Sequence, residues 1–218
     1  TGTVTPPLPA PSLLDITLNN TPTTGTIGNS WNASSGGALS VNALGARVYS
    51  SRSNVSSSSN GFLQFGSETG GLLGNLAGIV VGANVVMNMS ADKQIATTNQ
   101  LSTYGTNNFA YTFDLAINTG LLGLSNLSVL NSLSLDIYSG ATRIAGGSVF
   151  AQILGLTSLT ESSYTNNNFF FTYDPSTGPL SIRWSANVPV NAELLPLLFN
   201  TAGSNSIYSV GNTSLSFV

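Results

Sequence analysis

The fold class follows from the stretch FAYTFDLAIN, residues 109–118. Aromatic and aliphatic residues occupy every second position of this stretch, and the residues between them are small or polar. Such alternation is the pattern of a β-strand with one buried face and one exposed face. Residues 81–90 and 180–188 alternate in the same way. The sequence therefore predicts several long, half-buried strands.

Shorter alternating runs raise the prediction to roughly ten strands; they lie at residues 39–49, 63–65, 133–137, 143–151, 169–173, 207–210 and 215–217. The connecting stretches are rich in turn residues and include 56–61, 162–168 and 174–178, while 21–28 has the composition of a linker. Two Leu-rich segments, 120–133 and 191–200, fit either a short helix or an apolar loop. The pattern predicts an all-β, immunoglobulin-like or pilin-like β-sandwich with Greek-key connections.

Charged side chains are scarce. Lys plus Arg number 5 and Asp plus Glu number 8, so 6% of the 218 residues are charged, against about 25% in an ordinary soluble domain. Ser, Thr and Asn supply 79 residues instead, and the chain has neither His nor Cys. These absences remove imidazole acid–base chemistry, thiolate nucleophiles, disulfides and His/Cys metal sites. We therefore expect no enzyme activity, no catalytic residues, no metal and no cofactor apart from N-linked glycans.

The balance of charge also limits the partners. A net charge of −3 with five scattered basic residues argues against nucleic acid binding. No apolar run approaches the roughly 18 residues of a membrane-spanning helix, so no membrane span is expected. The chain starts at Thr1 without a leader, as expected for a mature exported protein. With few carboxylates to protonate, stability should vary little as the pH falls toward about 2–3.

The amino-terminal segment differs from the rest. Pro6, Pro7, Pro9 and Pro11 keep its first part out of a regular sheet. An isolated strand follows at Leu13–Asn19, in which Leu14, Ile16 and Leu18 face one way and Leu13 faces the other. We therefore divide the chain into an extended tail with its strand at residues 1–22 and a sandwich body at residues 23–218.

Asn-x-Ser/Thr sequons occur at Asn19, Asn32, Asn54, Asn88, Asn126 and Asn212. A chain so rich in Asn, Ser and Thr contains about six by chance, so their number carries no information. Four positions, Asn19, Asn32, Asn54 and Asn88, lie on polar strand faces or in Ser/Gly-rich stretches, where a glycan would find solvent. Several of the six are expected to be glycosylated in an exported chain.

Other motifs are weaker. Ser90-Ala91-Asp92-Lys93 matches the S-x-x-K word of acyl-transfer enzymes, but Lys93 is the single Lys and no K-T-G element accompanies it. Lys93 could alternatively form a crosslink to an Asn, although no partner is specified. Asp174 fits a turn, and the other acids fit surface positions better than a catalytic pair. Trp31, Trp184 and Tyr49 could line a sugar-binding face, although the face that Trp184 shares with Ile182 favours the core.

The isolated strand at Leu13–Asn19, the neutral polar sandwich body without Cys or His, and the sequons together resemble the subunits of archaeal surface threads. Those subunits are glycosylated, donor-strand-complemented pilins of thermoacidophilic archaea, similar in architecture to bacterial type 1 pilins. The chain lacks the cysteine pair of chaperone–usher pilins, which argues against that assembly route.

This resemblance implies a structural subunit of an extracellular, cell-surface filament that serves adhesion or biofilm formation. Identical subunits would join head to tail, with the tail strand of one copy entering an apolar groove of the next through Leu14, Ile16 and Leu18. Two other functions fit the composition: a capsid or surface-layer jelly-roll protein with an interlocking arm, and a secreted carbohydrate-binding module.

Overall fold

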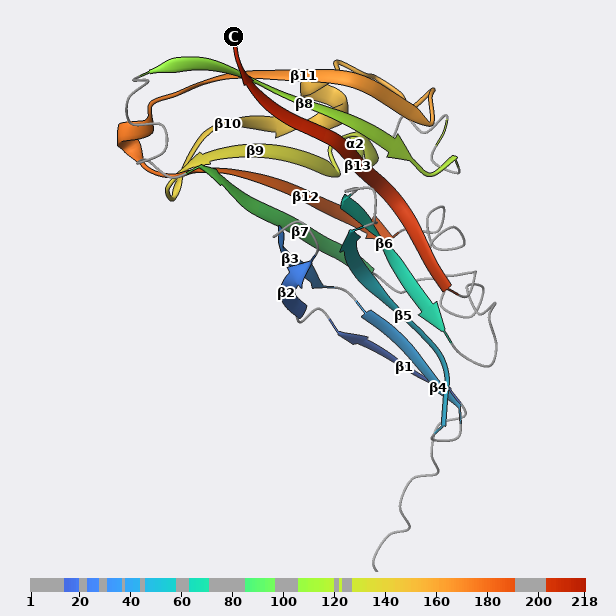
Figure 1. Cartoon of the computed structure of the whole chain (residues 1–218). Helices are drawn as coiled ribbons and strands as arrows, with labels where there is room; N and C mark the ends of the chain where they lie inside the picture. Colours follow the sequence, from blue (N-terminus) through green and yellow to red (C-terminus); the bar gives the residue numbers. More distant parts are fainter. Residues whose placement is uncertain are drawn as a thin grey trace, which may run out of the picture.

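The computed structural model describes residues 14–19, 23–27, 31–36, 38–43, 46–57, 63–70, 85–96, 106–119, 122, 127–190 and 203–218. In this part of the chain, thirteen strands form two antiparallel sheets (Figure 1). The larger sheet has the order β1 (Leu14–Asn19), β4 (Ala38–Ala43), β5 (Ala46–Ser57), β6 (Leu63–Gly70), β13 (Gly203–Phe217), β8 (Asn107–Ile117) and β11 (Ser163–Tyr173). The smaller has the order β10 (Thr142–Ser148), β9 (Leu133–Ser139), β12 (Leu180–Val190), β7 (Val85–Ala96), β3 (Trp31–Gly36) and β2 (Thr23–Ile27). The predicted all-β sandwich is confirmed.

Helical structure within the described residues is short. The helix α2 (Leu127–Leu130) occupies one turn of the Leu-rich segment 120–133, and most of the preceding part of that segment lies outside the described residues, as do residues 191–200. The π-helical turn η3 (Val149–Ile153) follows β10, so the strand predicted at 143–151 ends early, at Ser148. The 3₁₀ turn η4 (Pro175–Thr177) confirms the turn predicted at 174–178, with the Asp174 carboxylate accepting from the Ser176 backbone N–H.

Two predicted connections are wrong because they are strands. The linker predicted at 21–28 contains β2, whose Thr-rich sequence is compatible with an edge position beside β3. The turn predicted at 162–168 is the first half of β11, where a bulge between Tyr164 and Asn167 places Asn166 at φ 56°. Asn tolerates this left-handed conformation, so the polar run kinks the strand without ending it.

The core lies between β8 and β13 of one sheet and β7, β12 and β9 of the other. All five residues at the alternate positions of β8 from Phe109 to Ile117 are buried, as the sequence predicted. Trp184 is fully buried, with its ring 5.0 Å from that of Phe113 and its Nε1–H donating to the Tyr111 hydroxyl at 3.2 Å. Burial raises the pKa of Tyr111 to about 12, so this hydroxyl remains protonated. The predicted core position of Trp184 is confirmed.

The larger sheet is strongly staggered along its strands. Asn19 pairs with Ala38, Ala38 with Arg52, Arg52 with Glu68, and Glu68 with Ser204. The end of the chain at Val218 therefore lies fourteen residues along β13 from the level of Asn19, or about 46 Å at 3.3 Å per residue. Figure 1 shows the same separation, with β1 and the C-terminal end of β13 at opposite ends of the strands.

One carboxylate holds two irregular strands beside β8. The Asp114 side chain accepts from the Asn166 backbone N–H of the β11 bulge and from the Asn212 amide of a second bulge, in β13, at 2.7 Å each. Asn212 also has a left-handed backbone, with φ 48°. The hydrogen bond from Asn212, and then that from Asn166, lowers the pKa of Asp114 below its ordinary value of 3.8. Asp114 thus links β8 to the bulges of both neighbouring strands.

We predict that Asp114→Asn lowers the free energy of unfolding by about 0.5–1 kcal/mol near neutral pH, because an amide NH₂ replaces one acceptor oxygen at a solvent-accessible site. Since the folded pKa is lowered, the contribution of Asp114 is present above its ordinary pKa and is lost as the pH falls through the folded pKa. Melting temperatures at pH 5 and pH 2 test this. The difference between wild type and variant should be large at pH 5 and small at pH 2, and Glu161→Gln serves as the control. An equal difference at both pH values would contradict the prediction.

Candidate functional site

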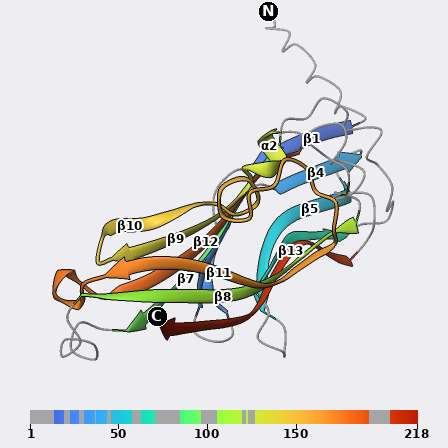
Figure 2. The same ribbon diagram turned by 90° about the horizontal axis from the view of Figure 1, so that it is seen from above.

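The ladder of β13 is incomplete on one side. Its first half pairs with β6, which begins at Leu63 opposite Val210, and its second half pairs with β8 on the other side. Among the described strands, none pairs with Gly211–Phe217 on the side away from β8. We call this edge the β13 notch. Figure 2 shows the C-terminal end of β13 at the margin of its sheet, beside β8.

Side chains near the notch pack against the core but are incompletely covered. Phe217 is 51% exposed although its ring lies 4.8 Å from that of the buried Phe109, and Leu215 is only partly buried. Thr213, within the bulge, hydrogen-bonds to Tyr111. The notch therefore presents both backbone hydrogen-bonding groups and an apolar surface, which are the two requirements for binding an added strand.

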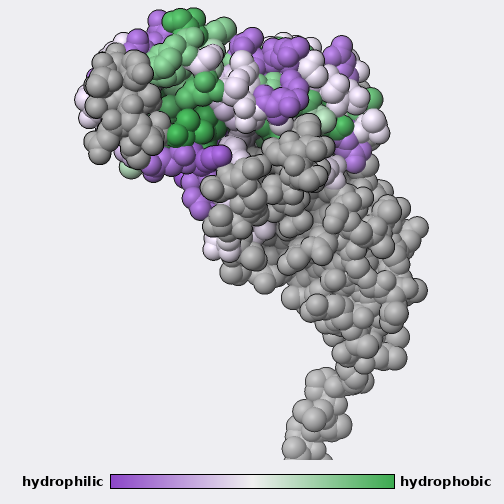
Figure 3. Space-filling model, in the orientation of Figure 1, coloured by the Kyte–Doolittle hydropathy of each residue, from purple (hydrophilic) through white to green (hydrophobic). Residues whose placement is uncertain are grey.

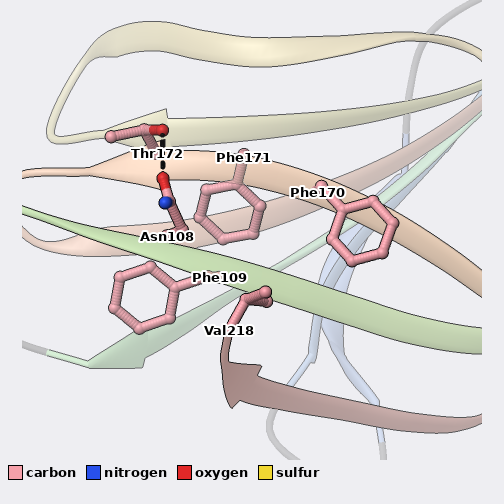
Figure 4. Close-up of a pocket in the computed structure, with 6 residues that line it drawn as sticks. All are labelled: Asn108, Phe109, Phe170, Phe171, Thr172 and Val218. Atoms are coloured by element: carbon pink, nitrogen blue, oxygen red, sulfur yellow. Dashed lines mark hydrogen bonds between the residues drawn. The ribbon is translucent and has the colours of Figure 1, made fainter.

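A second feature adjoins the notch on the outer face of the same sheet. It is an open hollow of about 320 Å³ lined by Asn108, Phe109, Phe170, Phe171, Thr172 and Val218 (Figure 4). We call it the outer groove. Phe170 is 64% exposed and Val218 is 73% exposed. Figure 3 shows hydrophobic surface gathered at this end of the molecule.

The polar side chains of the outer groove are ordered by one hydrogen bond. Thr172 Oγ1 donates to Asn108 Oδ1 at 2.9 Å, which links β11 to β8. With its oxygen engaged in this way, Asn108 Nδ2 has no hydrogen-bond partner in the part of the chain that the structure describes. The backbone N–H of Val218 donates to the Asn108 carbonyl at 3.0 Å and fixes the end of the chain beside the groove. The outer groove thus combines apolar walls with one oriented amide donor.

β11 is also an outer strand, and its eleven residues include no charged residue and no Pro. Its core-facing aromatic residues near the groove are nevertheless well covered, with Phe171 at 6% exposure and Tyr173 buried. The core is therefore closed along this part of β11 and less completely covered at the end of β13. We take the β13 notch and the outer groove as the candidate binding site.

The predicted donor strand lies far from this site in the same chain. Leu14, Ile16 and Leu18 are paired with Ala43, Val41 and Leu39 of β4. β4 occupies one edge of β1, and β1 is the outermost strand of the larger sheet. Leu13 lies outside the described residues.

Three of the predicted glycosylation sites have exposed side chains: Asn32, Asn88 and Asn212. Asn32 and Asn88 lie on β3 and β7 of the smaller sheet, whereas the Asn212 amide is engaged by Asp114. Asn19 and Asn54 lie on β1 and β5, and Asn126 lies outside the described residues.

The weaker motifs do not converge on a site. Trp31 and Trp184 are both buried, which argues against the sugar-binding face they could have lined. Lys93 Nζ lies 6.0 Å from the centre of the Trp31 ring and makes a cation–π contact with it. Ser90 and Lys93 both lie in strand β7, whereas the S-x-x-K motif requires a helix that presents the two side chains on one face. Among the described residues, no group of three or more acidic residues could hold a metal ion.

The sequence predicted the strand at Leu14–Asn19 but not the notch. The notch arises because β6 and β8 meet different halves of β13, and this follows from pairings between residues more than fifty positions apart. One sequence signal was present: Phe169, Phe170 and Phe171 are consecutive, so at least one of these side chains must leave the core face of a strand.

No known protein-family model and no curated protein sequence matches the chain. Within the described residues, no helix has the length and apolar character needed to cross a membrane.

We predict that two neighbouring aromatic residues of β11 differ sharply in their effect on folding. Phe171→Ala should lower the free energy of unfolding by about 3–5 kcal/mol, because Phe171 packs in the core at 5.7 Å from Phe109. Phe170→Ala should change it by less than about 0.5 kcal/mol, because that side chain is largely in solvent. Urea unfolding of both variants measures the difference, and similar losses would show that the outer groove is part of the core.

Proposed function

We propose that the chain is the structural subunit of an extracellular surface filament, assembled head to tail by strand donation and serving adhesion or biofilm formation. The N-terminal strand of one copy adds to the β13 notch of the next. The observation that carries this proposal is the stagger of the larger sheet, which separates β1 from the notch by most of the length of the strands. A strand at one end and an incomplete ladder at the other suit a repeating contact between copies.

The length and direction of the donor suit the notch. β1 has six residues, which fit within the seven residues Gly211–Phe217 of the notch. All strand pairs in the described part of the chain are antiparallel. An antiparallel donor would continue the line of β6, with Asn19 beside Asn212 and Leu14 beside Phe217. Leu14 and Ile16 would then lie on the same face as Phe217 and Leu215, which pack against the core. Among the described strands, β4 is the one that pairs with β1, so the other edge of β1 is proposed to accept the ladder of a neighbour.

The contact would be strong for its size. Burial of Leu14, Ile16 and Leu18 contributes about 1.5–3 kcal/mol each, and the backbone hydrogen bonds of the added strand contribute further. A strand that meets a notch is a heterologous contact, which leaves a free notch and a free strand on every growing chain of subunits. Such contacts produce filaments.

The composition of the surface is compatible with the proposed extracellular location. The neutral polar residues keep the subunit soluble without relying on ionisation, and Asn32 and Asn88 are exposed positions for N-linked glycans. In this proposal the glycans cover the outer face of the smaller sheet, away from the β13 notch. N-linked glycosylation and export of the chain are proposed together with filament formation.

We predict that Ile16→Asp abolishes filament formation, because it places a carboxylate on the apolar face of the donor strand. Thr17→Asp adds the same charge on the opposite face and should still polymerise. Electron microscopy of the purified full chain and sedimentation of the polymer measure the effect, and near-UV circular dichroism confirms that each variant is folded.

Several outcomes would overturn the proposal. One is wild-type protein that stays monomeric at high concentration. Another is Ile16→Asp protein that forms filaments as readily as wild type. Closed shells or two-dimensional lattices would favour the capsid or surface-layer alternative, and a monomer that retains oligosaccharide on a glycan array would favour the carbohydrate-binding module.

A further inference from the structure

The outer groove has no role in strand donation itself, because it lies on the outer face of the sheet. We infer that it binds the proline-rich segment Thr5–Pro11 of a neighbouring copy in a polyproline II conformation. The inference rests on the proposed function, since it takes the occupant to be the tail of the next subunit.

The chemistry of the outer groove matches that of a proline-rich ligand. None of its six lining side chains is charged, and the exposed Phe170 and Val218 provide apolar walls. Proline-rich segments bind between aromatic side chains, and their carbonyls stay available because polyproline II has no internal hydrogen bonds. Asn108 Nδ2, oriented by the bond from Thr172, is placed to donate to such a carbonyl.

The segment Thr5–Pro11 has the matching properties. Its sequence is TPPLPAP, with four prolines and no charge. Each Pro lacks a backbone N–H, so the segment cannot extend the ladder that begins at Leu14. In polyproline II, the segment spans about 19 Å at 3.1 Å per residue, which exceeds the roughly 10 Å from β13 across β8 to β11.

The segment of the same chain cannot reach the groove while β1 is paired with β4. Leu14 lies five residues before Asn19, and β1 runs parallel to β13, so Leu14 is about 60 Å along the strands from Val218. Pro6 precedes Leu14 by eight residues, which span at most about 28 Å. The occupant must therefore come from another copy.

Antiparallel donation brings the neighbour's segment to the right place. With Leu14 of the donor beside Phe217, the preceding residues leave the notch at Val218. Val218 is the first wall of the outer groove, and Phe170 on β11 is the far wall. The notch and the groove would then form one continuous surface for residues 5–19 of the next subunit. Parallel donation would place the proline-rich segment at the opposite end of the notch, beside Gly211.

A labelled peptide of residues 1–12, which lacks the donor strand, tests this inference by fluorescence anisotropy. The acceptor is the full chain carrying Ile16→Asp, which keeps the groove. We expect saturable binding that is about tenfold weaker with the additional change Phe170→Ala and is also weakened by Asn108→Asp, because a carboxylate oxygen replaces the donor. Leu122→Ala, which alters an exposed apolar residue outside the groove, should leave the affinity unchanged. A peptide with Pro6→Ala and Pro9→Ala should bind more weakly.

The result separates the two proposals. If wild type forms filaments but the peptide does not bind, or binds equally well to the Phe170→Ala protein, the groove inference is wrong and the filament proposal stands. If the peptide binds in a Phe170-dependent manner but wild type never polymerises, the groove inference stands as a peptide-binding site and the filament proposal is wrong.

Discussion

The hydrogen-bond ladder of β13 holds the larger sheet together. This strand of fifteen residues joins β6 through its first half and β8 through its second half, so it connects the strands near the amino terminus with those around the main core. Its partner changes at Val210 because β6 begins there. The same arrangement that unites the sheet therefore leaves one edge of β13 incomplete, and the candidate site is a consequence of how the fold is connected.

An incomplete edge is a hazard for most β-proteins, which protect such edges with charges, prolines or short strands. Charged residues are only 6% of this chain, and Gly211–Phe217 contains none. The bulge at Asn212 twists one part of the edge, and the Asp114 carboxylate accepts a hydrogen bond from the Asn212 amide. The bulge thus alters the geometry of this edge of β13, but no charged residue prevents the addition of another strand. A subunit made to accept a strand from a copy of itself requires both properties.

Local pattern predicted the parts of the fold that depend on neighbouring residues. Alternation identified β8, β9 and β12 because their apolar positions face one core, and Trp184 was assigned to that core for the same reason. Strand β2 and the first half of β11 were not predicted, because their polar sequences resemble those of loops. Pairing with β3 and β8, respectively, determines their structure. The strand Leu14–Asn19 could be predicted from alternation, whereas the notch and the outer groove depend on contacts distant in sequence.

In the proposed filament, the proline-rich segment would also control register. A slip of one residue would move Leu14, Ile16 and Leu18 to the opposite face of the added strand, which would expose them and bury Asp15 and Thr17. Because Pro11 and Pro9 cannot donate to the ladder, pairing cannot extend far beyond Ser12. If those prolines are also seated between Val218 and Phe170, the position of the donor is fixed at its start as well as along its length. In the proposed filament, strand addition would supply the affinity, and the groove would supply the register that makes every link the same.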